Sequence, residues 1–208
     1  PPRSTPKPSS AASDVYKRQI GCGALAHEIN EIIKLNDWNN VTLQCLNADL
    51  HNRPEKLPAK IKETIESNLN GYSKIFLAYA DCGTGGLIDS MLANYDIQRL
   101  EGAHCYEFYS GSKIFKELCD TEIGTFYLTD FLVKNFERLI IDGLGISKNP
   151  SLKELYFKNY KNVVYLAQKP DNDLKLKSRE CADSIGLEFS IHYTGLDNFE
   201  NQLNKAVI

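Results

Sequence analysis

The sequence predicts an α/β fold, with a Rossmann-like, mostly parallel sheet, helices on both of its faces and a helical insertion. Two observations lead to this prediction. From about residue 20 onward, short runs of β-branched and aromatic residues alternate with helical patterns at the spacing of βα units. Cysteine, histidine and acidic residues also recur directly after the predicted strands, where α/β sheets bind their ligands. With 208 residues, of which 42% are hydrophobic, the chain is long enough to bury a core of this kind.

The first 18 residues, PPRSTPKPSSAASDVYKR, differ in composition from the rest of the chain. Pro, Ser and basic residues dominate, and no apolar period begins before Ile20. The stretch resembles a translated adapter or assembly artefact at the end of an open reading frame. We therefore expect residues 1–18 to be a non-native or disordered leader and residues 19–208 to form a single α/β domain. The strand expected before IGCGALAHEI would then be reduced to the stub QIGCG.

Charge and cysteine content exclude several classes of protein. The chain carries 24 basic and 27 acidic residues, and 20 basic and 26 acidic residues remain without the leader, a net charge of -6 that disfavours nucleic-acid binding. No apolar stretch approaches the roughly 20 residues of a membrane span, and no signal-peptide pattern is visible. Six cysteines without an export signal are typical of reduced thiols or metal ligands. We expect a cytoplasmic protein without nucleic-acid or membrane partners.

The first half of the chain predicts the leading βα units. After the stub, a helix is expected at 24–36, because Leu25 and Ile29 begin an apolar face of helical period. VTLQCL, residues 41–46, is the second predicted strand. A polar, proline-punctuated connection then leads to a helix at 58–69, whose apolar residues recur every four positions.

The remaining elements follow from the same patterns. SKIFLAYA is the third predicted strand, a helix begins near Leu87, and DIQRLEG is a short fourth strand. TFYLTDFLVKNFERLIIDGL and SLKELYFKNY are predicted as an all-helical insertion, the second with a capping box formed by Ser151 and Glu154. NVVYLAQ is expected to resume the same sheet, followed by a charged helix at 173–185, the strand LEFSIHY and a C-terminal helix.

Chemically reactive residues follow each of the first four predicted strands. Because the carboxyl ends of parallel strands lie at one edge of a sheet, we expect these side chains to gather there. They are Cys22 after the first strand, His51 after the second, Asp81 and Cys82 after the third, and His104, Cys105 and Glu107 after the fourth.

We interpret this group first as a metal site. Thiolates and imidazoles are the ligands that zinc prefers, and loops from separate strands can bring them together. We expect Cys22, Cys82 and Cys105 to bind zinc, with His104 preferred over His51 as the fourth ligand. An open coordination position would polarise a bound thiol, water or carboxylate, whereas a closed tetrahedron would be structural.

Two other interpretations of this edge remain open. Cys82 or Cys105 could be a nucleophile at a helix N-terminus, with one of the two histidines as its base. Alternatively, the glycine loops GCGALA and CGTGG could hold a phosphate, with Gly83 and Gly85 offering backbone N–H groups.

Charged groups near the predicted edge would orient a substrate. Asp81 and Glu107 are expected to act on a substrate or on the metal ligands, and Arg53 could bind a carboxylate or phosphate. From the insertion, Thr125, Thr129 and Asp130 could reach the site, or Thr125 could simply cap a helix among ordinary core residues.

The other three cysteines are interpreted as packing residues. Cys45 shares one strand face with Val41 and Leu43, and a free cysteine behaves there as a small hydrophobe. Cys119 and Cys181 lie within helical patterns away from the predicted edge.

Seven blocks of the sequence, in order, resemble a family of uncharacterised bacterial and archaeal proteins, the domain of unknown function 1638. The blocks are IGCGALAHEI, HNRPE, DCGTGG, HCYEF, GTFYLTDFLV, YFKNY and VVYLAQ. The family's leading strand is missing here. Genes of this family often lie near those of corrinoid-dependent methyltransferases, so the resemblance implies a role in one-carbon metabolism.

Together these interpretations predict a zinc protein that acts on a small-molecule substrate in methyl transfer or a related one-carbon step. The alternative is a non-catalytic metallo-accessory module that docks on a corrinoid protein or methyltransferase, and a further alternative is a cysteine-nucleophile hydrolase.

Overall fold

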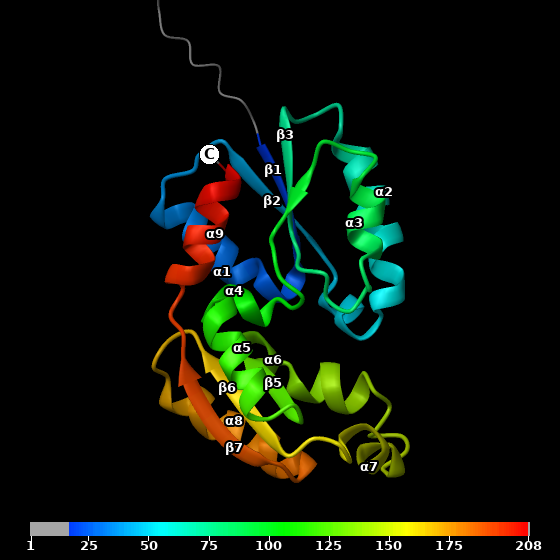
Figure 1. Ribbon diagram of the computed structural model, residues 1–208, viewed down its shortest axis with the longest axis vertical. Coiled ribbons are helices and arrows are strands. Elements are labelled where there is room, and N and C mark those ends of the chain that lie inside the picture. Colours follow the sequence, from blue (N-terminus) through cyan, green and yellow to red (C-terminus); the bar gives the residue numbers. More distant parts are fainter. Residues whose placement is uncertain (1–16, 208) are drawn as a thin grey trace, which may run out of the picture.

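The computed structural model describes residues 17–207, which form two parallel sheets flanked by helices (Figure 1). The predicted α/β class is confirmed. The expectation of one continuous sheet is wrong, because the strands that follow the fourth one form a sheet of their own. We call the part built on the four-stranded sheet the first lobe and the part built on the three-stranded sheet the second lobe.

The first lobe contains a parallel sheet with the strand order β2-β1-β3-β4. Its strands are β1 (Lys17–Cys22), β2 (Val41–Leu46), β3 (Lys74–Ala78) and β4 (Gln98–Arg99). The first strand pairs along its whole length with β2 and over five residues with β3, so it lies inside the sheet. Lys17 and Arg18, which we assigned to the leader, are therefore strand residues, and the rest of that predicted leader lies outside the described residues.

Helices cover both faces of the first sheet (Figure 1). On one side lie α1 (Ala26–Leu35) and α9 (Asp197–Val207), and on the other lie α2 (Leu57–Asn68) and α3 (Leu87–Leu92). Short 3-10 turns connect β1 to α1 and β2 to α2; they span Gly23–Leu25, Ala48–Asn52 and Pro54–Lys56.

The second lobe contains β5 (Thr125–Thr129), β6 (Asn162–Ala167) and β7 (Glu188–Tyr193), all parallel and in that order. Alternate residues of β6 face two different clusters, as the two-residue period of a strand requires. Its helices are α5 (Ser112–Thr121), α6 (Asp130–Lys134), α7 (Ser151–Phe157) and α8 (Asn172–Ile185), with a π-helical segment at Glu137–Asp142.

The segment TFYLTDFLVKNFERLIIDGL differs from its prediction, since it begins with strand β5 and not with helix. The five residues TFYLT are β-branched or aromatic except for the leucine, which favours a strand on a packed surface. The helical apolar pattern that follows comes from α6 and the π-helical segment, whose Leu132, Leu139 and Ile140 are buried. Because β5 and the helix that follows it were predicted as one helix, the second sheet was not predicted.

The C-terminal helix returns from the second lobe to pack on the first (Figure 1). It contacts β3 and α4 (Tyr106–Ser110), and the side chain of Asn198 donates to the carbonyl oxygen of Tyr109 at 3.1 Å. An ion pair between Lys169 and Glu31, 2.6 Å apart, joins the two lobes directly. Within residues 17–207, no helix combines the length and the apolar character that a bilayer span requires.

Candidate functional site

A cavity of about 440 Å³ lies between the carboxyl edge of the first sheet and the second lobe. The loops after β1, β2, β3 and β4 form one wall, and β5, α5 and the residues around them form the other. The lining residues are Cys22, Ala24, Leu25, Leu50, His51, Leu57, Tyr79, Cys82, Gly83, His104, Cys105, Tyr106, Tyr109, Phe115, Cys119, Ile123, Thr125, Phe126, Tyr127, Thr129, Leu132 and Tyr160.

The structure brings all five predicted metal ligands to this one cavity. Cys22 is the last residue of β1, and His51 lies in the 3-10 turn after β2. Cys82 follows β3, while His104 and Cys105 lie between β4 and α4. The parallel sheet explains this convergence, because residues that follow its strands meet at one edge.

The closest approach among these thiols joins Cys82 and Cys105, whose sulfur atoms are 3.0 Å apart. Two backbone hydrogen bonds hold their loops together: the Asp81 amide donates to the Gly102 carbonyl at 3.1 Å, and the Cys82 amide donates to the Ala103 carbonyl at 2.9 Å. The two thiols are free, as are the other four. The pair is therefore positioned by the backbone of both loops.

The three thiols have different pKa values because their surroundings differ. A hydrogen bond from Cys105 lowers the pKa of Cys82 despite its burial, and the same interaction, together with burial, raises the pKa of Cys105. Burial raises the pKa of Cys22 to about 12. Cys82 is thus the thiol that ionises first, which suits it to metal binding or nucleophilic attack.

The side-chain positions do not yet form a metal site. Within residues 17–207, no three His, Cys, Asp or Glu side chains are arranged to hold a metal ion. Two thiolates on a tetrahedral zinc with bonds of about 2.3 Å lie about 3.8 Å apart, so Cys82 and Cys105 would have to separate slightly.

Cys82 has a left-handed backbone, with φ of 51°. This conformation costs an L-residue with a Cβ about 1–2 kcal/mol, whereas glycine adopts it freely. We expect metal-free Cys82→Gly protein to be more stable than metal-free Cys82→Ala protein by about 1 kcal/mol, because both lose the thiol but only glycine relieves the backbone. Urea unfolding measures the difference. Equal stabilities, or a more stable alanine variant, would contradict backbone strain at this position.

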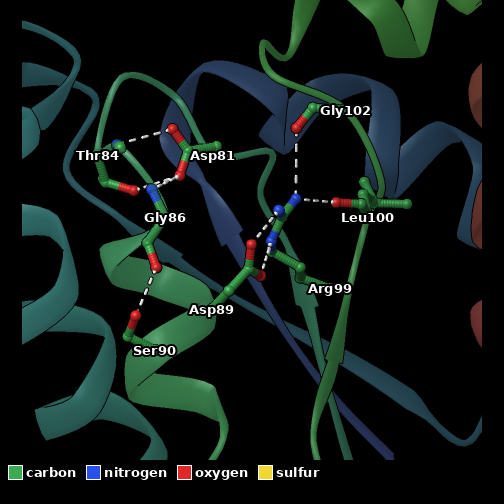
Figure 2. A network of polar contacts seen from close by, with 9 residues as sticks. Asp81, Thr84, Gly86, Asp89, Ser90, Arg99, Leu100 and Gly102 are labelled. Atoms are coloured by element: carbon green, nitrogen blue, oxygen red, sulfur yellow. Dashed lines mark hydrogen bonds and ion pairs between the residues drawn. The ribbon is translucent and has the colours of Figure 1, made fainter.

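Asp81 organises the loop that carries Cys82 (Figure 2). Its carboxylate accepts hydrogen bonds from the Thr84 hydroxyl at 2.6 Å and from the amides of Gly86 and Gly85 at 2.8 and 3.0 Å. Partial burial raises the pKa of Asp81, but these hydrogen bonds outweigh it and hold the pKa below its ordinary value. The carboxylate is directed at its own loop and is not among the cavity-lining groups.

A second carboxylate, that of Asp89, pairs with Arg99 beside this loop (Figure 2). Both oxygens of Asp89 on α3 accept from the guanidinium of Arg99, at 2.6 and 2.7 Å. Arg99 also donates to the carbonyl oxygens of Leu100 and Gly102. The Arg99 side chain, which sequence reasoning missed, therefore ties α3 to the segment that leads to Cys105.

Of the other charged groups predicted at the site, Glu107 has structural contacts. Glu107 accepts from the amides of Ala103 and His104, at 2.7 and 3.3 Å, so it caps the turn before α4. Neither Glu107 nor Arg53 lines the cavity. Of the two glycines expected to bind a phosphate, Gly83 lines the cavity, whereas Gly85 uses its amide on Asp81.

The two histidines lie at the solvent-facing side of the cavity, where both have exposed side chains. Desolvation of the ring, and then the nearby His104, lowers the pKa of His51, which favours the neutral form that binds metals. The ring of His104 lies 6.2 Å from those of Tyr106 and Phe115, measured between centroids.

The remaining cysteines differ in part from their predicted roles. Cys181 is buried in the second lobe, as expected, but Cys45 is exposed, whereas Val41 on the same face of β2 is buried. Cys119 lines the cavity, with its sulfur 3.4 Å from the hydroxyl oxygen of Tyr127. The prediction placed Cys119 away from the site because the sequence does not show that its helix faces the first lobe.

The second lobe contributes further residues to the cavity. Thr125 and Thr129 of β5 line it, whereas Asp130 accepts hydrogen bonds from the Tyr165 hydroxyl and the Gln168 amide, at 2.7 and 3.2 Å. Two lining residues that sequence reasoning missed are Tyr79 and Tyr109, both 1% exposed. Tyr79 ends the run SKIFLAYA, and its position before Asp81 was the signal that could have placed it at the edge.

The fold and the site define a two-lobed α/β protein with a thiol-bearing cavity between its lobes. The chain belongs to the family described as "Protein of unknown function (DUF1638)", which matches residues 45–203. Four of the five predicted ligands fall within that match, and Cys22 precedes it. Neither a curated protein nor a solved structure matches the chain.

Proposed function

We propose that the protein binds a zinc ion in this cavity through the thiolates of Cys22, Cys82 and Cys105 and presents it to a small-molecule ligand. One observation carries the proposal: three cysteines, one at the end of β1 and two in separate loops, line a single cavity, and the sulfur atoms of Cys82 and Cys105 are 3.0 Å apart. Soft thiolates gathered in this way are typical of zinc sites.

In this proposal the metal site exchanges its fourth ligand. Three thiolates leave one tetrahedral position, and His104 or His51 at the solvent-facing side can fill it in the resting protein. A substrate entering the cavity would displace that histidine. When bound, zinc would lower the pKa of a thiol or water placed in this position.

Within this proposal, the reaction is methyl transfer to a small thiol or a related one-carbon step, and the protein works in the reducing cytoplasm, where its six free cysteines persist. The alternative is an accessory module, in which a histidine permanently fills the fourth position and the protein docks on a corrinoid protein or methyltransferase. Ligand exchange at the metal distinguishes the two, since only the open site exchanges its fourth ligand.

Metal analysis under reducing conditions tests the proposal. We expect about one zinc per chain in the wild-type protein after loading and dialysis, and at least a tenfold lower metal content in Cys82→Ser and Cys105→Ser. Cys45→Ser is the matched control, because Cys45 is an exposed cysteine of the same sheet outside the cavity. Wild-type protein without stoichiometric metal, or serine variants that retain it, would contradict the zinc site.

A second function, nucleophilic attack by Cys82, is favoured by the lowered pKa of this thiol. In that case metal-free protein would be the active form. Cys82 would then react with iodoacetamide at pH 7 faster than Cys45, and added zinc would suppress the reaction without being retained stoichiometrically on dialysis.

A further inference from the structure

We propose that Cys82 and Cys105 are a reversible redox pair, which a low-molecular-weight disulfide such as glutathione disulfide oxidises to an intramolecular disulfide. Formation of this bond does not require the metal. Its consequence, the release of zinc from the cavity, rests on the proposed function, because a sulfur atom in a disulfide is no longer a thiolate ligand.

The separation of the two sulfur atoms carries the inference. They lie 3.0 Å apart, about 1 Å more than the roughly 2.05 Å of a disulfide bond. Two thiolates on a tetrahedral zinc ion would instead lie about 3.8 Å apart. Oxidation and metal binding therefore move the same two atoms in opposite directions, and the two states exclude each other.

The backbone holds the two cysteines close together before any bond forms. The Cys82 amide donates to the Ala103 carbonyl at 2.9 Å, two residues before Cys105. The Asp81 amide donates to the Gly102 carbonyl at 3.1 Å. Because these hydrogen bonds fix the two loops relative to each other, little chain entropy is lost when one thiol attacks the other. The pair therefore has a high effective concentration.

A small oxidant can reach the pair from solvent. Both cysteines are half-buried, and both line the cavity. Gly83 follows Cys82 and His104 precedes Cys105, and these two neighbours are exposed and line the same cavity. An accessible thiol with a second thiol beside it is the usual arrangement of reversibly oxidised cysteines.

The reaction consumes two thiols and one disulfide. The thiolate of one cysteine attacks a sulfur atom of glutathione disulfide, the bond between the two glutathione sulfurs breaks, and one glutathione leaves as a thiolate. The second cysteine loses its proton, attacks the sulfur of the first and expels the other glutathione. The cysteines thus give up two protons and two electrons, and both glutathiones are released in the reduced form. Excess dithiothreitol reverses the exchange.

The test treats metal-free wild-type protein with one equivalent of glutathione disulfide. The remaining thiols are blocked with iodoacetamide, and peptide mapping by mass spectrometry identifies the linked cysteines. We expect the disulfide between Cys82 and Cys105 to exceed the mixed disulfide of the exposed Cys45 with glutathione at least about tenfold, because ring closure is intramolecular. Of the six free thiols, two are consumed and four should remain.

Three variants identify the pair. Cys82→Ser and Cys105→Ser should each give at most about a tenth of the wild-type yield of intramolecular disulfide, because each leaves one thiol without its neighbour. Cys45→Ser is the matched control and should form the same disulfide as wild type. Urea unfolding checks that the variants fold, and the mapping of wild-type protein does not depend on them. Wild-type thiols that stay reduced, or a wild-type disulfide that includes Cys22, would overturn the inference.

Zinc content, measured on the same samples before and after oxidation, keeps this test separate from that of the metal site. We expect zinc-loaded wild-type protein to lose its metal in proportion to the disulfide formed and to bind it again after treatment with dithiothreitol. If metal-free protein forms no disulfide but binds zinc, only the redox inference fails. If the disulfide forms in a protein that never retains zinc, only the metal site fails. Zinc that stays bound after the disulfide has formed would overturn the release.

Discussion

Phe199→Ala is expected to lower the free energy of unfolding by about 3–5 kcal/mol, the usual cost of truncating a buried aromatic residue. Phe199 is completely buried on α9, where its ring stacks on Phe108 at a centroid distance of 5.5 Å and meets Tyr109 edge-on at 5.7 Å. Phe199 belongs to the core of the first lobe, where α9 packs on both α4 and the first sheet.

Urea denaturation measures this loss, and Leu176→Ala is the matched control. Leu176 is 61% exposed on α8, so its truncation should change stability by at most about 0.5 kcal/mol. A loss of stability below about 1 kcal/mol would show that α9 does not support the first lobe as described.

Asp81→Ala is expected to lower the free energy of unfolding at pH 7 by about 2–3 kcal/mol. The substitution removes an anionic acceptor from three donors, and hydrogen bonds to charged groups contribute about 1.5–3 kcal/mol each when shielded from water. The lower total allows for the partial exposure of this carboxylate. Because the loop carries Cys82, the variant should also bind zinc more weakly.

The effect of Asp81 should depend on pH. Its folded pKa is below its ordinary value of about 3.9, so the unfolded chain binds the proton more tightly. The carboxylate therefore stabilises the fold fully above that value, and the contribution decreases as the pH falls through the folded pKa. Urea unfolding at pH 7, 4 and 3 should show the difference between wild type and Asp81→Ala shrinking. The exposed Asp96, substituted in the same way, should show little difference at any of these pH values.

Much of the fold follows from local patterns in the sequence. Strand β3 lies within the predicted run SKIFLAYA, and β2 has the predicted bounds, 41–46. The helix expected at 24–36 contains α1, although Glu28, which lies between Leu25 and Ile32 on that apolar face, was not recognised as buried. The position of this carboxylate on an apolar helix face could have indicated its burial. In the structure, burial raises the pKa of Glu28.

The candidate site was predicted only on its first-lobe side. The positions after β1 to β4 were sufficient to gather the thiols and histidines, because parallel strands end at one edge. The roles expected for Asp81 and Glu107 could not be judged from position, since each carboxylate turns towards amides of its own loop. Cys119 and Tyr127 line the cavity from the second lobe. A fold with a single sheet has no second lobe, so the prediction could not include this wall.

The sequence by itself determined most of the strands and helices, with β5 as an exception, and the reactive residues that follow the first four strands, because periods of 2 and 3.6 residues and strand ends are local properties. Tertiary structure alone decided that the strands divide into two sheets, that β5 and α5 close the cavity, and that Cys82 lies 3.0 Å from Cys105. These features depend on strand order and on packing between residues distant in the chain, which no local pattern specifies.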